Sequence, residues 1–264
     1  MGEKKYVSIN EKKYVLVDLS VPISHRAKSE PKPARIIYSS HKNGTKMAEP
    51  AGVKSEDFPD GIGLASEELT LITHVGTHLD APYHFGPTVE GKPAKTIDQV
   101  PLKWCIGNGI VLDLTHKEEN APISELDIRN AIDKTRYEIQ PWDIVLIRTG
   151  RDKLWGSRDY PWVHPGMTRE ATLHLLNKGV KIIGTDAYGF DRPFTVMFKE
   201  TQEGTKSALW PAHFTGRDKE YLHIEKLANL DKLPSHGFIF MAFPILIKGA
   251  SAGWIRAVAL VPKE

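Results

Sequence analysis

The sequence is poor in cysteine, in long apolar runs and in charge of one sign. Its single cysteine, Cys105, can form neither an intramolecular disulfide nor a Cys-x-x-Cys zinc or redox motif, so we expect a reducing compartment. The longest apolar run, residues 238–247, is interrupted by Pro244 and is about half as long as a membrane helix requires. Because the N-terminal residues also lack an apolar segment, we predict a cytoplasmic protein without a signal peptide.

The charge balance excludes two classes of partner. The 35 Lys and Arg residues oppose 33 Asp and Glu residues, which gives a net charge of +2 that is spread along the chain. Such a chain has no basic or acidic patch of the kind that binds nucleic acid or an anionic membrane, so we expect a small-molecule substrate. With 264 residues, 41% of them apolar, and no linker or repeat, the sequence predicts a single domain over residues 1–264 that needs no disulfide.

The local patterns indicate an α/β protein with a mixed sheet. Stretches rich in Val, Ile and Leu predict seven strands, at residues 14–19, 69–73, 109–114, 144–148, 180–184, 238–247 and 254–261. Ser124 and Thr168 are typical N-caps of two helices, and Gly179 ends the second. Residues 22–63 and 186–214 have no clear period, and loops this long usually form binding loops or lids.

Three histidines and an aspartate crowd into residues 74–84. All four stand at even positions: His74, His78, Asp80 and His84. If this segment leaves the strand 69–73 and stays extended, a period of two places the four side chains on one side. Gly76 and Pro82 both argue against a helix here.

Imidazole nitrogens and a carboxylate that converge on one point are typical ligands of Zn²⁺ or Mn²⁺. Three protein ligands leave coordination positions open for water, and an open site can lower the pKa of that water and polarise a carbonyl group. A closed structural zinc site, or surface histidines on a loop, would explain the same residues without catalysis.

The segment resembles the His-x-Gly-Thr-His-x-Asp-x-Pro-x-His signature of the cyclase-like metal-dependent hydrolases, which include bacterial kynurenine formamidase, isatin hydrolase and trans-dienelactone hydrolase. Residues 74–84 match every fixed position. Asp18-Leu19-Ser20 and residues 178–186 are similar to two further strand ends of that family, and the resemblance spans roughly residues 14–262. It implies the family's swivelling β/β/α fold, in a homodimer or homotetramer.

The resemblance also implies roles for individual residues. It makes metal ligands of His74, His78 and Asp80, and it makes His84 the general acid/base. His213 and Glu225, twelve residues apart as in the family, would hold a second ion, so we expect one or two zinc or manganese ions per chain. Aromatic residues beside the motif and in the second long loop are candidates for substrate binding: Phe85, Tyr188, Phe190 and Trp210.

The leading hypothesis is a metal-dependent hydrolase that opens a cyclic amide, such as an isatin-like lactam, or cleaves an aryl formamide. A lactone or enol-lactone hydrolase would use the same residues, and a non-enzymatic metal protein would need His84 as an additional ligand. The formamidase has a Trp-Pro-Gly-Asp-like stretch where this chain has residues 21–26, which disfavours formylkynurenine as the substrate. Residues 22–63 are our candidate for an arm that completes a neighbour's pocket.

Two other motifs carry less weight. Gly249 to Gly253 fits the Gly-x-Ser-x-Gly nucleophile elbow, but no histidine follows His236, so we expect Ser251 to shape a turn near the pocket. Asp186 ends a predicted strand and could either order the site from behind or cap a turn.

Overall fold

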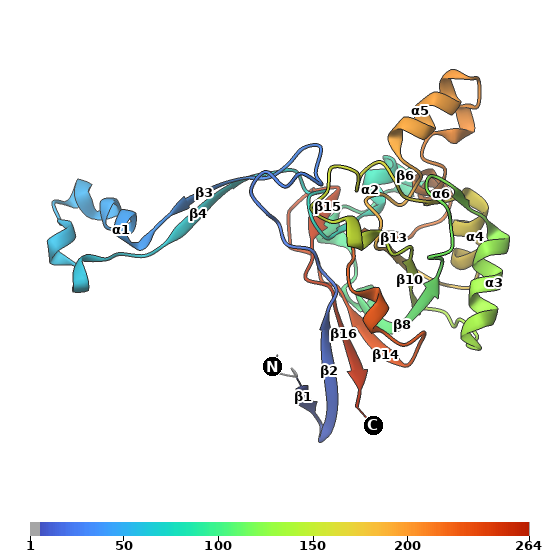
Figure 1. Cartoon of the computed structure of the whole chain (residues 1–264), viewed down its shortest axis with the longest axis horizontal. Coiled ribbons are helices and arrows are strands. Elements are labelled where there is room, and N and C mark those ends of the chain that lie inside the picture. Colours follow the sequence, from blue (N-terminus) through green and yellow to red (C-terminus); the bar gives the residue numbers. More distant parts are fainter. Residues whose placement is uncertain (1–5, 264) are drawn as a thin grey trace.

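One mixed sheet dominates the structure, which is a computed structural model that describes residues 6–263. Within these residues the sheet has ten strands, in the spatial order β1 (Tyr6–Ile9), β2 (Lys12–Asp18), β16 (Val258–Pro262), β14 (Phe238–Met241), β8 (Ile106–Asp113), β10 (Ile144–Arg148), β12 (Ile182–Thr185), β13 (Leu222–Glu225), β5 (His78–Asp80) and β15 (Ala252–Trp254). Strands β8, β10, β12 and β13 are parallel, and the strands on either side of them pair antiparallel (Figure 1). The predicted α/β class with a mixed sheet is confirmed.

Three helices cover one face of the parallel strands: α3 (Glu125–Thr135), α4 (Arg169–Asn177) and α6 (Pro211–Asp218). The remaining helices are α1 (His41–Gly44), α2 (Pro82–Phe85) and α5 (Phe194–Gln202). Small two-stranded sheets are formed by β3 (Arg35–Ser39) with β4 (Ser66–Thr70), β6 (Thr88–Val89) with β7 (Lys92–Pro93), and β9 (Pro122–Ile123) with β11 (Gly166–Met167). Among the helices of residues 6–263, none is long and apolar enough to span a bilayer.

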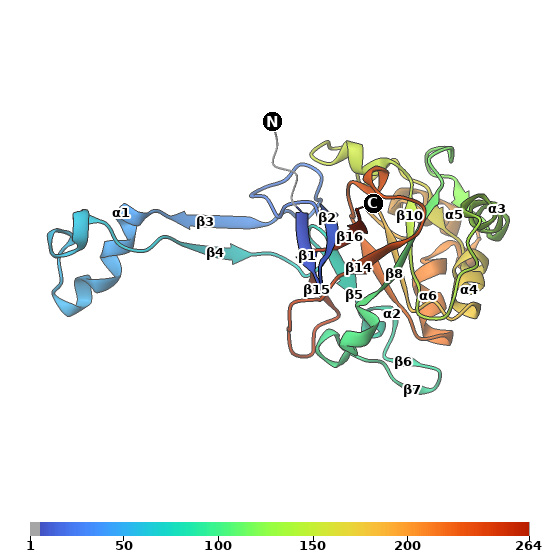
Figure 2. The same ribbon diagram turned by 90° about the horizontal axis from the view of Figure 1, so that it is seen from below.

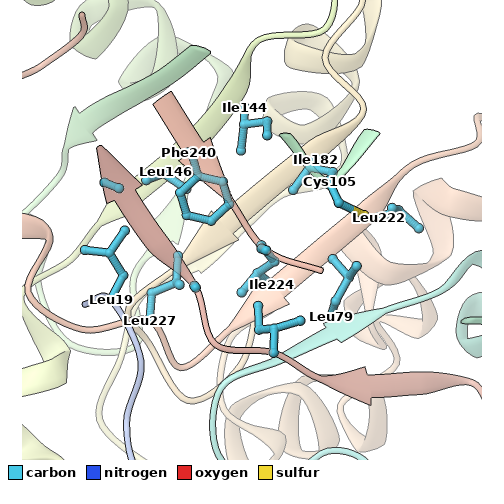
Figure 3. Packing of buried hydrophobic residues seen from close by; sticks show 14 of the residues in the cluster. Leu19, Leu79, Cys105, Ile144, Leu146, Ile182, Leu222, Ile224, Leu227 and Phe240 are labelled. Carbon is cyan, nitrogen blue, oxygen red and sulfur yellow. The ribbon is translucent and has the colours of Figure 1, made fainter. Parts of the chain in front are cut away.

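Hydrophobic packing covers both faces of the parallel strands, which explains their continuous apolar sequences. In β10, Ile144 and Leu146 enter the core inside the curled sheet, whereas Val145 and Ile147 pack under the helices. Figure 3 shows the inner core, where Leu146 lies with Phe240 and Ile224. Because side chains alternate along each strand, the same packing determines which residues of β5 and β13 face away from this core.

Several predicted elements are confirmed because their signals are local. β10 spans residues 144–148 as expected. The hydroxyl of Ser124 accepts a hydrogen bond from Asp127 N–H at the start of α3, and Thr168 caps α4 in the same way. Helix α4 ends at Asn177, two residues before Gly179.

Other predicted boundaries are wrong, and each has a physical reason. The strand expected at 238–247 ends at Met241, and the chain beyond it is irregular except for an isolated bridge at Pro244. The strand expected at 254–261 is divided because β15 pairs with β5, whereas β16 pairs with β14 and β2. The second expected loop, 186–214, contains α5 and the start of α6. Apolar residues of these two helices pack against each other, as Phe198 and Trp210 do, so they do not show the regular spacing of a helix that packs on a sheet.

Residues 35–70 form an arm that projects from the body (Figure 2). β3 and β4 pair antiparallel along it, and α1 lies at its tip with short 3₁₀ turns. The strand predicted at 69–73 is mostly wrong. β4 ends at Thr70, and it pairs with β3 within the arm and not with the main sheet. All five residues of β4 are exposed.

Candidate metal centre

Strand pairing builds one side of the site. β5 lies antiparallel to β13, with His78 opposite Glu225 and Asp80 opposite His223. Directly opposite residues on antiparallel strands point to the same face, so these four side chains form a square of potential ligands. The residues between them, Leu79 and Ile224, point to the other face and are fully buried in the core (Figure 3).

The turn before β5 adds His74 as a fifth potential ligand. Gly76 adopts φ +66°, and an added Cβ would lie 3.0 Å from Ile23, so this position favours glycine for both conformation and space. The turn returns His74 to the strand: its Nδ1 lies 3.0 Å from Asp80 Oδ1 and 3.3 Å from His78 Nε2. His78 Nε2 is 3.4 Å from the same Asp80 oxygen.

A second group of ligands lies on the other side of Asp80. His223 Nε2 is 2.9 Å from Asp80 Oδ2 and 3.6 Å from Glu225 Oε1. His213 Nε2, from α6, is 4.0 Å and 3.8 Å from these same two oxygens. The other oxygen of Glu225 lies 3.6 Å from His78 Nε2, so both carboxylates stand between the two groups.

Hydrogen bonds fix which nitrogen of His78, His213 and His223 faces the centre. His78 Nδ1 binds the Gly76 carbonyl at 2.9 Å, and His213 Nδ1 binds the Asp191 carboxylate. His223 Nδ1 lies 3.3 Å from the hydroxyl of Tyr221, which itself donates to the Ala212 carbonyl. With each Nδ1 as a donor, the Nε2 atoms of His78, His213 and His223 face the centre.

The centre therefore gathers mainly acceptors, although His74 Nδ1 can donate to His78 Nε2 at 3.3 Å. Both oxygens of Asp80 and Nε2 of His223 are buried and have no hydrogen-bond partner among residues 6–263. Their 2.9 Å approach lacks the geometry of a hydrogen bond. Buried polar atoms without partners are unfavourable unless something occupies the space between them, and a cation satisfies lone pairs and carboxylates together.

The distances fit metal ions. Two ligands about 2.1 Å from a tetrahedral ion lie about 3.4 Å apart. The separations of 3.0–3.4 Å within His74, His78 and Asp80, and the four histidine–carboxylate separations of 2.9–4.0 Å within Asp80, His213, His223 and Glu225, all lie within about 0.6 Å of that value. We call these the first and the second ligand group.

The pKa values of these residues respond to burial and to the crowded charges. Burial opposes the charge of Asp80, but the neighbouring His84, His74 and His78 outweigh it and hold the pKa of Asp80 well below its usual range. Burial lowers the pKa of His78 to about 4 and that of His84 to about 4. Both imidazoles are therefore neutral at neutral pH and have lone pairs to offer.

His84 stands beside the ligand groups without belonging to either. It lies on α2, whose first residue is Pro82, so the predicted extended conformation is wrong here because proline also suits the first turn of a helix. The Nε2 of His84 is 3.8 Å from Asp80 Oδ2, and its ring centre is 4.3 Å from that of His74. About a third of its side chain is exposed. The structure thus brings all six predicted ligand and acid/base residues together.

A cavity of about 480 Å³ opens next to the ligands, and its walls are largely aromatic. Three of the predicted substrate-binding residues line it: Tyr188, Phe190 and Trp210. Phe85 does not line it. Its ring is 1% exposed and stacks 5.1 Å from Tyr221, in a space that Gly216 leaves free on α6.

Two functional residues were missed by the sequence analysis. On β13, His223 and Glu225 stand two residues apart, as His78 and Asp80 do on β5. This repeated spacing was the signal available in the sequence. Asp191 orients His213 and also accepts the N–H groups of Ala212 and His213, but no sequence motif marks it.

Asp186 and Ser251 have supporting positions. Asp186 accepts hydrogen bonds from Thr149 N, Thr149 Oγ1 and Gly150 N, so it caps the turn after β10 and does not contact the ligand groups. Ser251 lies in the turn before β15, where its hydroxyl is 3.4 Å from His74 Nε2.

Comparisons with known proteins agree with this geometry. The family model described as "Putative cyclase" matches residues 17–192. The chain is 32% identical to the isatin hydrolase of Roseibium aggregatum over 225 residues, which cover 79% of this chain and 80% of the relative. It is 29% identical to the kynurenine formamidase of Salinibacter ruber over 215 residues, covering 78% and 82%. A solved isatin hydrolase bound to the product analogue thioisatinate superposes with a TM-score of 0.71 and 27% identity, over 94% of this chain and 92% of that one.

Proposed function

Since the chain belongs to the putative cyclase family, we propose that it is a metal-dependent hydrolase that opens a cyclic amide, such as an isatin-like lactam, or cleaves an aryl formamide. The observation that carries this proposal is the convergence of imidazole lone pairs and two carboxylates beside an aromatic cavity. Relatives named isatin hydrolase and kynurenine formamidase support the choice of carbon–nitrogen bond.

The two ligand groups differ in how many protein atoms they supply. The first group, His74, His78 and Asp80, has three ligands, which leaves coordination positions for water and substrate. The second group has four. Nitrogen and carboxylate ligands suit zinc and manganese alike. A divalent ion bound here would lower the pKa of a water molecule and polarise the substrate carbonyl.

His84 is the proposed general acid/base. It is neutral at neutral pH, reaches the cavity, and lies 3.8 Å from Asp80 without being held in a ligand group. It can therefore accept the proton of the attacking water and pass it to the leaving nitrogen. Asp191 fixes the ring of His213, and the N–H of Phe190 donates to Glu225 Oε1 at 2.9 Å, so both ligands are held before substrate binds.

The cavity favours a flat apolar substrate. Phe190, Trp210 and Phe214 contribute aromatic walls, and Met197 adds a flexible apolar side chain. A flat lactam and a flat lactone can both place their carbonyl group at the ligands. The assay therefore decides whether the leaving atom is nitrogen or oxygen.

The proposed activity is tested by metal analysis together with turnover. The protein is purified without a metal-binding tag, its zinc and manganese are measured by inductively coupled plasma mass spectrometry, and an isatin-like lactam, an aryl formamide and an aryl lactone are assayed. We expect one or two ions per chain, loss of hydrolysis after chelation, and recovery when metal returns. A protein that neither holds nor takes up metal would overturn the proposal, as would full activity after complete removal of metal.

We further propose that the protein works as a homodimer or homotetramer in which the arm contacts a neighbouring copy. Apolar side chains on the arm are strongly exposed, with Tyr38 at 64%, Met47 at 75% and Leu64 at 77%. Exposed apolar residues grouped on one projecting segment are typical of an interaction surface. Size-exclusion chromatography with light scattering should show a dimer or tetramer, and replacement of residues 40–65 by a short glycine-serine turn should reduce it to a monomer. A monomeric full-length chain would refute this.

A further inference from the structure

A buried ion pair lies beside the first ligand group, in the wall of the same cavity. The side chains of Lys226 and Glu30 are 1% and 2% exposed. Lys226 Nζ donates to both carboxylate oxygens of Glu30, at 3.0 and 2.8 Å, and to the backbone carbonyl of His74 at 2.7 Å. All three hydrogens of the ammonium group therefore have acceptors, and the ring of Tyr188 lies 4.3 Å away.

Glu30 holds the same turn from its other end. Its Oε1 accepts the N–H of Gly76 at 2.9 Å. The ion pair thus binds the carbonyl of His74 and the amide of Gly76, the two backbone groups on either side of Val75. The same turn brings His74 Nδ1 to Asp80. The ion pair therefore holds the backbone next to this ligand by hydrogen bonds, and not its imidazole ring.

The backbone of Lys226 is adapted to this position. Lys226 has φ +62°, a conformation that is unfavourable for a residue with a Cβ atom and that Gly and Asn adopt more readily. Its N–H donates to the Ala187 carbonyl, and its own carbonyl accepts the hydroxyl of Thr77 at 2.6 Å. The consecutive residues Glu225 and Lys226 therefore have different roles. Glu225 is one of the potential metal ligands, and Lys226 binds the turn that carries His74.

The pair contributes geometry and no net charge. Two buried opposite charges are not favourable by themselves compared with apolar residues of the same size, and removal of one partner leaves an uncompensated charge. Since every donor of Lys226 is already used, it has no proton or hydrogen bond to offer a substrate.

We infer that Lys226 and Glu30 are positioning residues that hold His74 in place and thereby set the metal affinity of the first ligand group. This inference rests on the proposed function. Partners behind metal ligands typically change metal affinity by 10- to 100-fold when they are removed.

Zinc affinity, measured by chelator competition, tests the inference in two backgrounds. His213→Ala leaves the first group intact and removes one of the four ligands of the second, and His74→Ala leaves the second group intact and removes one of the three ligands of the first. We expect Lys226→Met to weaken zinc binding about 10- to 100-fold in the His213→Ala background and by less than about threefold in the His74→Ala background. A purely structural loss would weaken both alike.

Two further variants complete the design. Glu30→Gln keeps the size of the side chain and one acceptor, so it decides the question if Lys226→Met does not fold, and we expect an effect in the same direction. Lys117→Met is the matched control, because Lys117 forms a 3.0 Å ion pair with Asp127 away from the site. It should leave zinc affinity unchanged.

The outcomes separate the inference from the function. Unchanged zinc affinity of folded Lys226→Met and Glu30→Gln in the His213→Ala background would overturn the inference, as would equal weakening in both backgrounds. A parent protein that binds no zinc would instead overturn the proposed function, and this inference with it. A His213→Ala protein that binds no zinc while the parent binds it would overturn the inference alone, because the first group would then hold no ion by itself.

Discussion

His164 makes the stability of the protein depend on pH in a way that can be isolated. The residue is 1% exposed, its Nδ1 donates to the Pro165 carbonyl at 3.1 Å, and its Nε2 has no partner among the described residues. Burial lowers the pKa of His164 to about 4. In the unfolded chain its pKa is about 6.5, so protonation favours the unfolded state.

The sign and size of the effect follow from these two pKa values. Because the folded pKa is the lower one, the contribution to stability is complete above about pH 6.5 and declines as pH falls toward 4. The full difference corresponds to about 3 kcal/mol, and at pH 5 about 2 kcal/mol of it is already lost. Near pH 7.5 the residue is neutral in both states and the loss is close to zero.

The test replaces the ring by one that cannot titrate. His164→Phe should have a free energy of unfolding that falls by about 2 kcal/mol less than that of the parent between pH 7.5 and 5.0. Urea unfolding of metal-free protein, followed by tryptophan fluorescence, measures this difference. His116→Gln, at an exposed histidine, should follow the parent. An identical pH dependence in His164→Phe and the parent would refute the reasoning.

Three substitutions test the centre itself. His84→Ala should abolish turnover while bound metal stays near the parent level, and full activity would remove His84 from the mechanism. Asp80→Ala should lose metal and activity together, because its two oxygens face both ligand groups, and a metal-replete active variant would contradict its role. Asp191→Asn should weaken metal binding about 10- to 100-fold, since both Asp191 oxygens are needed to hold α6 and His213, and unchanged chelator competition would argue against this.

The parts of the fold that were predictable have strong local signals. β10 is apolar at every residue but its last because both of its faces are buried, and α3 and α4 begin at residues whose hydroxyls cap them. The arm gives no such signal. Every residue of β4 is exposed, so no alternation between buried and exposed positions marks it as a strand.

The candidate site shows the same division. Residues 74–84 are close in sequence, so their ligands could be proposed from spacing, although the segment is a turn, a strand and a helical turn in succession and not one extended run. His223 required knowledge that β5 pairs with β13, a contact between residues far apart in the chain. Asp191 required the packing of α6 against the preceding loop.

The ligands and the cavity walls come from different kinds of structure, and this bears on how specificity arises. His78, Asp80, His223 and Glu225 project from two paired strands whose alternate residues, Leu79 and Ile224, are anchored in the core. A change in these strands would disturb core and ligands together. The aromatic walls come instead from the segment that contains α5 and the start of α6, outside the main sheet. Substitutions there can reshape the cavity while the ligands stay fixed, so substrate preference depends on residues that the metal-binding motif does not contain.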